Sequence, residues 1–198
     1  MEHAGLPPAR TTSSLVSARL ILRPVPWDAV LAITAGDRLD DWAGDYPGDG
    51  DVMIAGLLLG ADQAVGQGAG QQAGQGVVPG EAPGEVQPAG EPADQAWGHR
   101  QVVERASGLV VGGIGFFGPP LGGEAEIGYG IVPSRQGRGY ATEALLAMIT
   151  MAWADARVRT VVAGTDPGNA ASQRVLEKAG LRRVSAAGEF RYRLTRPA

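Results

Sequence analysis

A short turn with two glycines, residues 136–141 (QGRGYA), constrains this chain more than any other stretch. It follows an alternating, strand-like run at 124–132 and precedes a helix-like run at 142–155. Closely spaced glycines allow a tight turn and a close approach of the backbone to a ligand. The helix that follows directs its first unpaired N–H groups and the positive end of its dipole into the turn, which suits a phosphate. Arg138 adds a fixed positive charge, so the sequence predicts a strand, an anion-binding turn and a helix.

Charge is unevenly divided along the 198 residues, whose formal net charge is -4. Residues 1–99 carry 4 Lys or Arg and 13 Asp or Glu, whereas residues 100–198 carry 13 and 8. The basic half suits an anionic ligand and the acidic half a cationic one, although solvated surfaces explain the same distribution equally well. The chain has no cysteine and only two histidines, which argues against disulfides, thiolate chemistry and a histidine-built metal site.

We predict a flexible arm at residues 1–17 and a single domain at 18–198, because a chain of this length fits one hydrophobic core. A segment rich in Gly, Gln, Pro and Ala, at about 60–96, interrupts that domain, and four valines are its only large aliphatic residues. Such a segment buries too little apolar surface to offset its ordering entropy, so we expect a disordered insertion. A hinge, a tether for a partner and neutral drift are its alternative roles, and drift is favoured.

Short runs with strand or helix periodicity make up the rest of the sequence. We expect strands at 18–25, 98–104, 109–117, 124–132, 160–163, 182–185 and 190–194, and helices at 27–35, 51–59, 142–155 and after Asn169. Asn169 is placed to cap the last of these helices. Gly128 and Gly130 share one face of their strand and leave room for something to lie against it.

The N-terminus lacks the pattern of a secretion signal, and the longest apolar run, at 52–59, is far shorter than the ~20 residues that cross a bilayer. We therefore expect a cytoplasmic protein with no membrane partner. No basic stripe with interleaved aromatic residues is present, so nucleic acid is not expected as a partner either. The sequence leaves a monomer and a homodimer equally open.

Two common nucleotide-binding motifs do not fit the turn at 136–141. A Walker A loop would end in Gly-Lys-Ser or Gly-Lys-Thr, and that sequence is absent. A Rossmann fingerprint would need a second βαβ unit with an acidic residue at the end of its next strand. The turn lies late in the chain, after a predicted hairpin, so both interpretations weaken.

The constellation as a whole resembles the GCN5-related N-acetyltransferase (GNAT) superfamily. Residues 136–141 match that family's acetyl-CoA loop, Gln/Arg-x-x-Gly-x-Gly/Ala, and 125–129 (AEIGY) are similar to the strand before it. Residues 169–172 (NAAS) and 177–181 (EKAGL) are similar to its late helix. Residues 19–24 (RLILRP) resemble the opening strand of the ribosomal-protein-alanine acetyltransferase branch.

This resemblance implies an α/β (α+β) GNAT fold, in which helices flank a central mixed sheet that splays open beside the strand ending at Val132. It implies acetyl-CoA as the cosubstrate and no metal. Pantetheine would pair with the backbone in the gap, and the pyrophosphate would lie on the N–H groups of the turn, in agreement with the independent interpretation of that turn as an anion site. The implied cofactor-binding residues are Ile131, Val132, Gln136, Gly137, Arg138, Gly139, Tyr140, Ala141, Asn169 and Ser172.

The implied chemistry is direct transfer of acetyl to an amine, which attacks only when it is neutral. Glu126 is the implied general base and Glu124 its substitute, although an exposed or arginine-paired strand glutamate explains Glu126 as well. Backbone N–H groups near Val132 could stabilise the oxyanion. Leu176 stands where many members carry an acid tyrosine, so Ser172 and Tyr129 are left as donors to the departing sulfur. A helix cap and a packed strand tyrosine are the structural alternatives for those two residues.

We therefore predict an acetyl-CoA-dependent N-acetyltransferase that acts on a primary amine. A peptide or protein N-terminus is favoured as acceptor, and a small-molecule amine is a close alternative. A function of another class is a non-catalytic module that keeps the fold and senses CoA or binds a partner through the insertion. Turnover distinguishes the two, because a sensor binds acetyl-CoA without consuming it.

Overall fold

A computed structural model describes residues 14–66, 97–185 and 188–197 of the chain. Its strands are β1 (Leu15–Val16), β2 (Leu20–Pro24), β3 (His99–Glu104), β4 (Val110–Phe116), β5 (Glu124–Ile131), β6 (Thr160–Thr165), β7 (Arg182–Arg183) and β8 (Phe190–Thr195). Its α-helices are α1 (Trp27–Ala35), α2 (Asp49–Gly66), α3 (Tyr140–Trp153) and α4 (Ala170–Lys178), and a 3-10 turn, η2, spans Pro133–Arg135.

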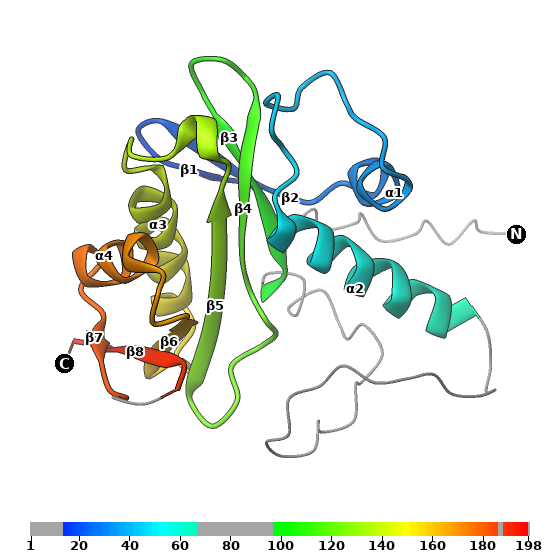
Figure 1. The fold of residues 1–198 in the computed structure, drawn as a ribbon. Coiled ribbons are helices and arrows are strands. Elements are labelled where there is room, and N and C mark those ends of the chain that lie inside the picture. Colours follow the sequence, from blue (N-terminus) through cyan, green and yellow to red (C-terminus); the bar gives the residue numbers. More distant parts are fainter. Residues whose placement is uncertain (1–13, 67–96, 186–187, 198) are drawn as a thin grey trace, which may run out of the picture.

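The eight strands form one mixed sheet in the order β1-β2-β3-β4-β5-β6-β8-β7. Only the β5–β6 pair is parallel among the described strands. α3 connects these two strands, as a parallel pair requires a crossover. Figure 1 shows α3 and α4 on one side of β5, and α1 and α2 on the other. The predicted GNAT-like arrangement of a mixed sheet flanked by helices is confirmed.

The sheet opens between β5 and β6. Their ladder joins only residues 124–126 of β5 to residues 160–162 of β6. Beyond it β5 continues to Ile131 along β4, while β6 continues to Thr165 along β8. The predicted splay is therefore confirmed, and the far half of β5 turns one backbone edge into an open gap.

The hydrophobic core includes the apolar helix faces that the sequence periodicity predicted. α3 buries a stripe of apolar side chains at helical spacing, because Leu145, Met148, Ile149 and Ala152 are all under 5% exposed. Leu176 of α4 is fully buried against the same core. Packing of α3 beneath β5 fixes the start of this helix relative to the end of the strand.

Two predicted boundaries are wrong. The arm predicted at 1–17 ends in structure, because Leu15 and Val16 pair with Leu22 and Ile21 as β1. The predicted helix at 51–59 is longer at both ends, and its backbone continues to Gly66, inside the segment predicted as a disordered insertion. No proline interrupts the chain there, so the helical hydrogen bonding continues. The rest of the predicted insertion and the first 13 residues lie outside the described residues.

Within the described ranges, no helix combines the length and the apolar character that crossing a membrane requires. In the same ranges, no group of three or more His, Cys, Asp or Glu side chains is arranged to hold a metal ion.

Candidate active site

The predicted turn joins β5 to α3 with the geometry of an anion site. Gly137 and Gly139 adopt positive φ angles of 73° and 80°, which disfavour other residues. Gly139 is the N-cap of α3, and no side chain caps the helix there. The N–H groups of the first helical turn therefore remain for a ligand, at the positive end of the dipole. The local sequence predicted this geometry correctly.

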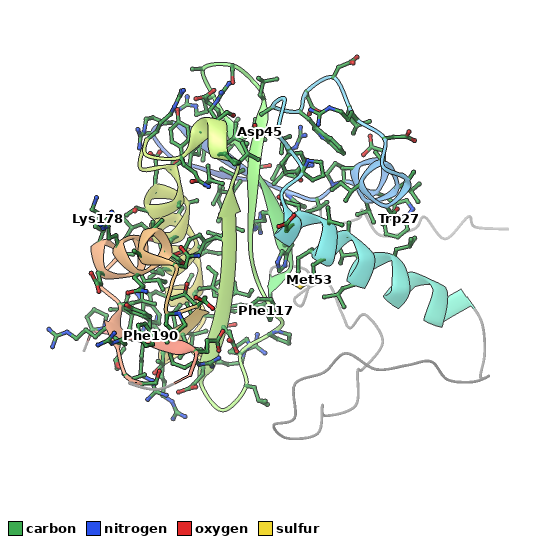
Figure 2. All side chains as sticks on the ribbon, viewed as in Figure 1. Trp27, Asp45, Met53, Phe117, Lys178 and Phe190 are labelled. Carbon is green, nitrogen blue, oxygen red and sulfur yellow. The ribbon has the colours of Figure 1, made fainter. Side chains whose placement is uncertain are left out.

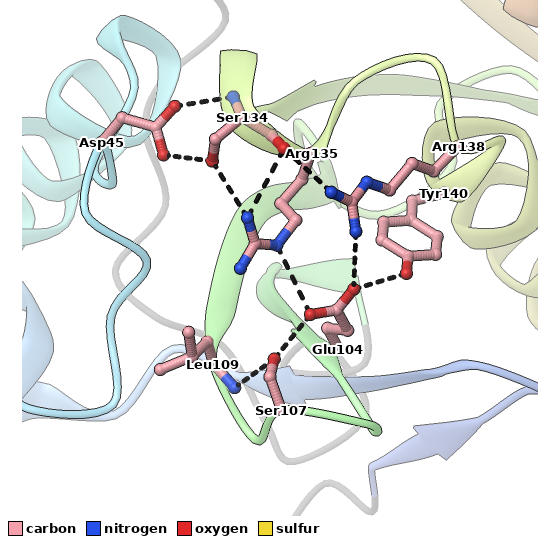
Figure 3. A network of polar contacts seen from close by, with 8 residues as sticks. All are labelled: Asp45, Glu104, Ser107, Leu109, Ser134, Arg135, Arg138 and Tyr140. Carbon is pink, nitrogen blue, oxygen red and sulfur yellow. Dashed lines mark hydrogen bonds and ion pairs between the residues drawn. The ribbon is translucent and has the colours of Figure 1, made fainter.

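A polar network holds the turn from below (Figure 3). The nearly buried Glu104 carboxylate of β3 accepts hydrogen bonds from the hydroxyls of Tyr140 (2.5 Å) and Ser107 (2.6 Å). These hydrogen bonds, Ser107 first, hold the pKa of Glu104 below its usual value. At the start of the turn, Asp45 accepts from the backbone N–H (2.8 Å) and hydroxyl (2.7 Å) of Ser134. Two carboxylates from distant segments thus fix the turn before any ligand arrives.

Two predicted phosphate-turn side chains contribute to this network. The Arg138 guanidinium lies 3.7 Å from Glu104 and is not among the described residues that line a cavity. In this structure the Arg138 charge is thus paired with a protein carboxylate, and its predicted contact with a phosphate stays a prediction. The Tyr140 side chain is buried on Glu104, so only its backbone faces the turn.

A cavity of about 400 Å³ opens above the turn, between the end of β5 and α4, and we call it the α4-side cavity. The turn, the start of α3 and one face of α4, from its start to Lys178, line it. Its charged lining residues are Arg135, Arg174 and Lys178, and no Asp or Glu is among the described residues that line it. Its backbone donors and cations together suit a ligand with several phosphates.

Strand register decides which backbone groups of β5 face the gap. The Val132 N–H donates to the Val111 carbonyl (2.9 Å), and the Val132 carbonyl accepts from the Arg135 N–H (2.9 Å). Because hydrogen bonding alternates along an antiparallel ladder, Tyr129 and Ile131 turn their backbone groups away from β4 and into the gap. Both backbone groups of Val132 are thus engaged within the protein, so the predicted pairing of a ligand with Val132 does not fit this structure. The predicted oxyanion donor near Val132 stays a prediction, because the neighbouring Ile131 N–H faces the gap. Ile131 remains a candidate.

Gln136 closes the end of β5. Its side-chain amide donates to the Ile131 carbonyl (2.8 Å), so the Ile131 N–H is the backbone group left for a ligand at that residue. Gln136 also lines the α4-side cavity together with Gly137 and Ala141. The first residue of the motif thus fixes the strand edge on which an extended ligand would lie.

Asn169 and Ser172 lie across the gap from β5. The Asn169 side chain accepts from the Ser172 N–H (3.0 Å), which confirms the predicted cap of α4. The Ser172 hydroxyl lies 2.9 Å from the Tyr129 hydroxyl, so the two candidate donors form one pair. Burial raises the pKa of Tyr129 to about 12, which keeps its hydroxyl protonated near neutral pH. Leu176 lies in the core, so no group takes the place of the absent tyrosine there.

Glu126 does not face either cavity. Its carboxylate forms an ion pair with Arg191 of β8 at 2.8 Å, and it is not among the described residues lining a cavity. Glu124, the predicted substitute, is paired with Arg193 in the same way. Both carboxylates lie beside the paired half of β5 and β6, before the sheet opens. This ion pair favours the alternative interpretation of Glu126 as an arginine-paired strand residue, and its role as general base stays an untested prediction.

A second cavity, of about 690 Å³, lies on the other side of β5, and we call it the α2-side cavity. Met53 of α2 and Phe117 lie on this side, whereas Lys178 lies at the end of α4, on the other side of β5 (Figure 2). Its described lining residues include no Lys or Arg. The acidic lining residues are Asp45, Asp49, Asp51 and Asp166.

The two cavities meet across the gap, because both are lined by the same six residues. These are Tyr129, Gly130, Ile131, Gln136, Asn169 and Ser172. A long ligand in the α4-side cavity would therefore present its end to a second ligand in the α2-side cavity. The hydroxyl pair of Tyr129 and Ser172 stands at this meeting point.

Two titratable groups of the α2-side cavity were missed at the sequence level. Burial raises the pKa of Asp51 to about 6, against hydrogen bonds from Gly48 and Tyr46 that lower it. Burial lowers the pKa of His99 to about 4, so its imidazole is neutral near pH 7. Only the dense acidic sequence before residue 52 hinted at such a site. The packing that places these groups is long-range.

Two joined cavities across a splayed sheet, with a glycine turn at the start of a helix on one side, suit an enzyme that brings a phosphate-bearing cosubstrate next to a second substrate. The family model described as acetyltransferase (GNAT) domain matches residues 81–182, just over half of the chain. The chain therefore belongs to the GNAT acetyltransferase family, and it is an acyltransferase. Family membership favours the catalytic one of the two predicted functions.

Several solved structures share this fold. The chain is 19% identical to a GNAT-family acetyltransferase from Bacillus anthracis, with a TM-score of 0.57 over 92% of this chain and 98% of that one. It is 20% identical to RimJ from Mycobacterium smegmatis in complex with CoA-disulfide, with a TM-score of 0.51, covering 89% and 81%. It is 16% identical to RimL, a ribosomal L7/L12 alpha-N-protein acetyltransferase in complex with coenzyme A, with a TM-score of 0.58, covering 92% and 98%. No curated protein matches the sequence.

Proposed function

We propose that this protein transfers acetyl from acetyl-CoA to a primary amine, with a peptide or protein N-terminus as the preferred acceptor. The observation that carries the proposal is the pair of joined cavities with opposite lining charge. The cationic one suits the phosphates of CoA, and the acidic one suits an ammonium group. A small-molecule amine is the second acceptor class.

The residues of the α4-side cavity fit acetyl-CoA. The backbone from Gly137 to Ala141 would hold the pyrophosphate, because two left-handed glycines turn N–H groups of the loop and of α3 toward one point. Tyr129 and Ile131 would pair with pantetheine along the open edge of β5, as an added strand does. The thioester would then lie beside Ser172 at the junction of the cavities.

The chain's own groups can serve the leaving thiolate. The neutral Tyr129 and Ser172 hydroxyls are hydrogen-bonded to each other, so either can donate to sulfur while the other supports it. Asn169 orients this pair by capping α4 at the Ser172 N–H. Asn169, and not Ser172, caps α4, and the Ser172 hydroxyl is paired with Tyr129 instead, which supports the donor alternative for Ser172 over the cap alternative.

The preference for a protein N-terminus rests on the opening-strand sequence at 19–24 and on the acidic α2-side cavity. RimJ and RimL share the fold, and RimL is an acetyltransferase of a protein α-amino group. An α-amino group has a pKa of ~8, so it needs less help to lose its proton than a lysine amine at ~10.4.

The test is release of free CoA thiol from acetyl-CoA with a panel of amines: peptides with free N-termini, N-blocked lysine peptides, polyamines and aminoglycosides. We expect release with the N-terminal peptides above all. Release with polyamines or aminoglycosides alone would replace the acceptor class. Tight acetyl-CoA binding without release from any amine would contradict the proposal.

A further inference from the structure

The floor of the α2-side cavity is made of glycines. Gly113 and Gly115 of β4 are the cross-strand partners of Gly130 and Gly128 of β5. Directly paired residues face the same side of a sheet, so these four positions form one patch without side chains. The patch lets groups from other elements lie directly on the backbone beside the gap.

Three of the four positions are already covered. A Cβ on Gly128 would meet the Phe117 ring at 2.8 Å, and one on Gly115 would meet His99 Nδ1 at 2.7 Å. A Cβ on Gly130 would meet nothing within 4 Å, so the floor is open there, at one of the six residues shared by both cavities. This open position is where an acceptor can approach the thioester.

Asp51 covers the remaining position, Gly113. A Cβ on Gly113 would collide with its Oδ1, so the carboxylate lies on β4 one strand away from Gly130. Adjacent strands are only ~5 Å apart, which brings this oxygen near the open floor. Its other oxygen, Oδ2, accepts from the Gly48 N–H (3.1 Å) at the start of α2, so the side chain is held in place.

We propose, on the basis of the function proposed above, that Asp51 is the general base that accepts a proton from the ammonium group of the acceptor amine. It lies in the first turn of α2, lines the α2-side cavity, and keeps one oxygen over the glycine floor. Glu126, which the sequence favoured, is paired with Arg191 and faces neither cavity.

The groups around Asp51 fit this role. Tyr46, His99 and Arg100 line a small void with it, and the Tyr46 hydroxyl hydrogen-bonds to its carboxyl. Burial raises the pKa of Asp51 to about 6, so it is ionised at pH 7 yet a stronger base than an ordinary carboxylate. His99, with a pKa of about 4, is the weaker base of the two.

The proposed transfer conserves protons and electrons. The ammonium N–H bond breaks and its proton goes to Asp51, which leaves a neutral amine. The amine nitrogen forms a bond to the thioester carbonyl carbon, the carbon–sulfur bond breaks, and the electron pair leaves with sulfur. The second proton of the new amide nitrogen passes to the thiolate through the Ser172 and Tyr129 hydroxyls, and Asp51 returns its proton to solvent.

The experiment compares wild-type protein with Asp51→Asn and Gly113→Ala, using acetyl-CoA and a hexapeptide with a free N-terminal alanine. Gly113→Ala keeps the carboxyl but displaces it, because the added Cβ collides with Oδ1. Asp40→Asn is the matched control, since Asp40 is exposed and lines neither cavity. Thiol release is measured from pH 5.5 to 9, and acetyl-CoA binding is measured separately.

We expect Asp51→Asn to lower kcat at pH 7 by about 100-fold, within the range for a general base. The loss should shrink above pH 8, where the α-amine loses its proton without help, whereas a merely structural role would give a loss independent of pH. Gly113→Ala should show the same pH-dependent loss, and acetyl-CoA affinity should be unchanged in all variants.

An Asp51→Asn variant that keeps kcat within twofold, with the wild-type pH profile, would overturn the role of Asp51 alone. An equal loss at every pH, with folding intact by circular dichroism, would also overturn it. A wild-type protein that binds acetyl-CoA but acetylates no amine would instead overturn the proposed function, and this inference with it.

Discussion

The α4-side and α2-side cavities share six lining residues but are built in opposite ways. The α4-side cavity is made mainly from contiguous sequence, a turn and the helix after it, and its charged lining is cationic. The α2-side cavity is assembled from α2, β3, β4, β5 and the segment after β6, and its charged lining is acidic. A local motif therefore reveals where one substrate binds, whereas the other site exists only after the sheet has formed.

The largest expected effect is on acetyl-CoA binding in the α4-side cavity. Gly139→Asp should weaken acetyl-CoA binding by at least about 100-fold, because it places a carboxylate in the anion site at a residue with φ of 80°. Gly139→Asn is the control, since asparagine tolerates the left-handed conformation without adding charge. Isothermal titration calorimetry measures both. Binding by Gly139→Asp within threefold of wild type would mean that the turn does not hold the phosphates.

The second prediction concerns the α2-side cavity, where the buried, ionised carboxylate of Asp51 should lower the free energy of unfolding. The folded-state pKa of Asp51, about 6, lies above its ordinary 3.8. The protonated carboxyl therefore contributes stability that is fully present below pH ~4 and is lost as the pH rises through about 6. Asp51→Asn mimics the neutral form, so at pH 8 it should raise the free energy of unfolding by about 1–3 kcal/mol.

Urea unfolding at pH 8 and pH 4 measures this effect, with Asp40→Asn as the control. The gain should disappear at pH 4, where the wild-type carboxyl is itself protonated. A lower stability of Asp51→Asn at pH 8 would show instead that the hydrogen bond of Asp51 to the Gly48 N–H stabilises the start of α2 by more than burial of its charge costs. Higher stability together with lower activity would be the mark of a functional residue.

A smaller effect tests the cationic lining. Arg174→Ala removes one of the three cations of the α4-side cavity and should weaken acetyl-CoA binding about 3- to 10-fold, with less effect at high salt. Arg182→Ala removes an equal charge from an exposed residue that lines neither cavity. If both variants lost acetyl-CoA affinity equally, the effect would come from the net charge of the protein and not from the lining of the α4-side cavity.

The smallest effect concerns Glu126. Because it is paired with Arg191 away from both cavities, Glu126→Gln should leave kcat within about twofold and the pH profile unchanged. Steady-state thiol release across pH checks this. If the pH–rate profile of this variant no longer fell at low pH, Glu126 would be the base, and the proposal for Asp51 would be wrong.

The sequence predicted what depends on neighbouring residues. The glycines at 137 and 139 specify a turn by their conformational freedom, and Asn169 specifies a cap by its distance from Ser172. The sheet class and its splay were implied by the family resemblance and are confirmed. The pairing of Arg138 with Glu104 was not predicted, because the two residues are 34 positions apart in sequence.

The α2-side cavity could not be predicted for the same physical reason. Gly113 and Asp51 come together only through the packing of α2 on β4. The Val132 N–H is used by β4, which depends on strand register, and no motif in β5 encodes that register. Pairing of Glu126 with Arg191 depends on β8, the last strand of the chain.

The most direct test of the two-cavity mechanism is a single time course with acetyl-CoA and the alanine hexapeptide, followed by thiol release and mass spectrometry together. Transfer between the two cavities predicts equal amounts of free CoA and monoacetylated peptide, with the acetyl group on the α-amine. CoA release without acetylated peptide, or bound acetyl-CoA that no amine consumes, would contradict the claim that the two cavities serve one transfer reaction.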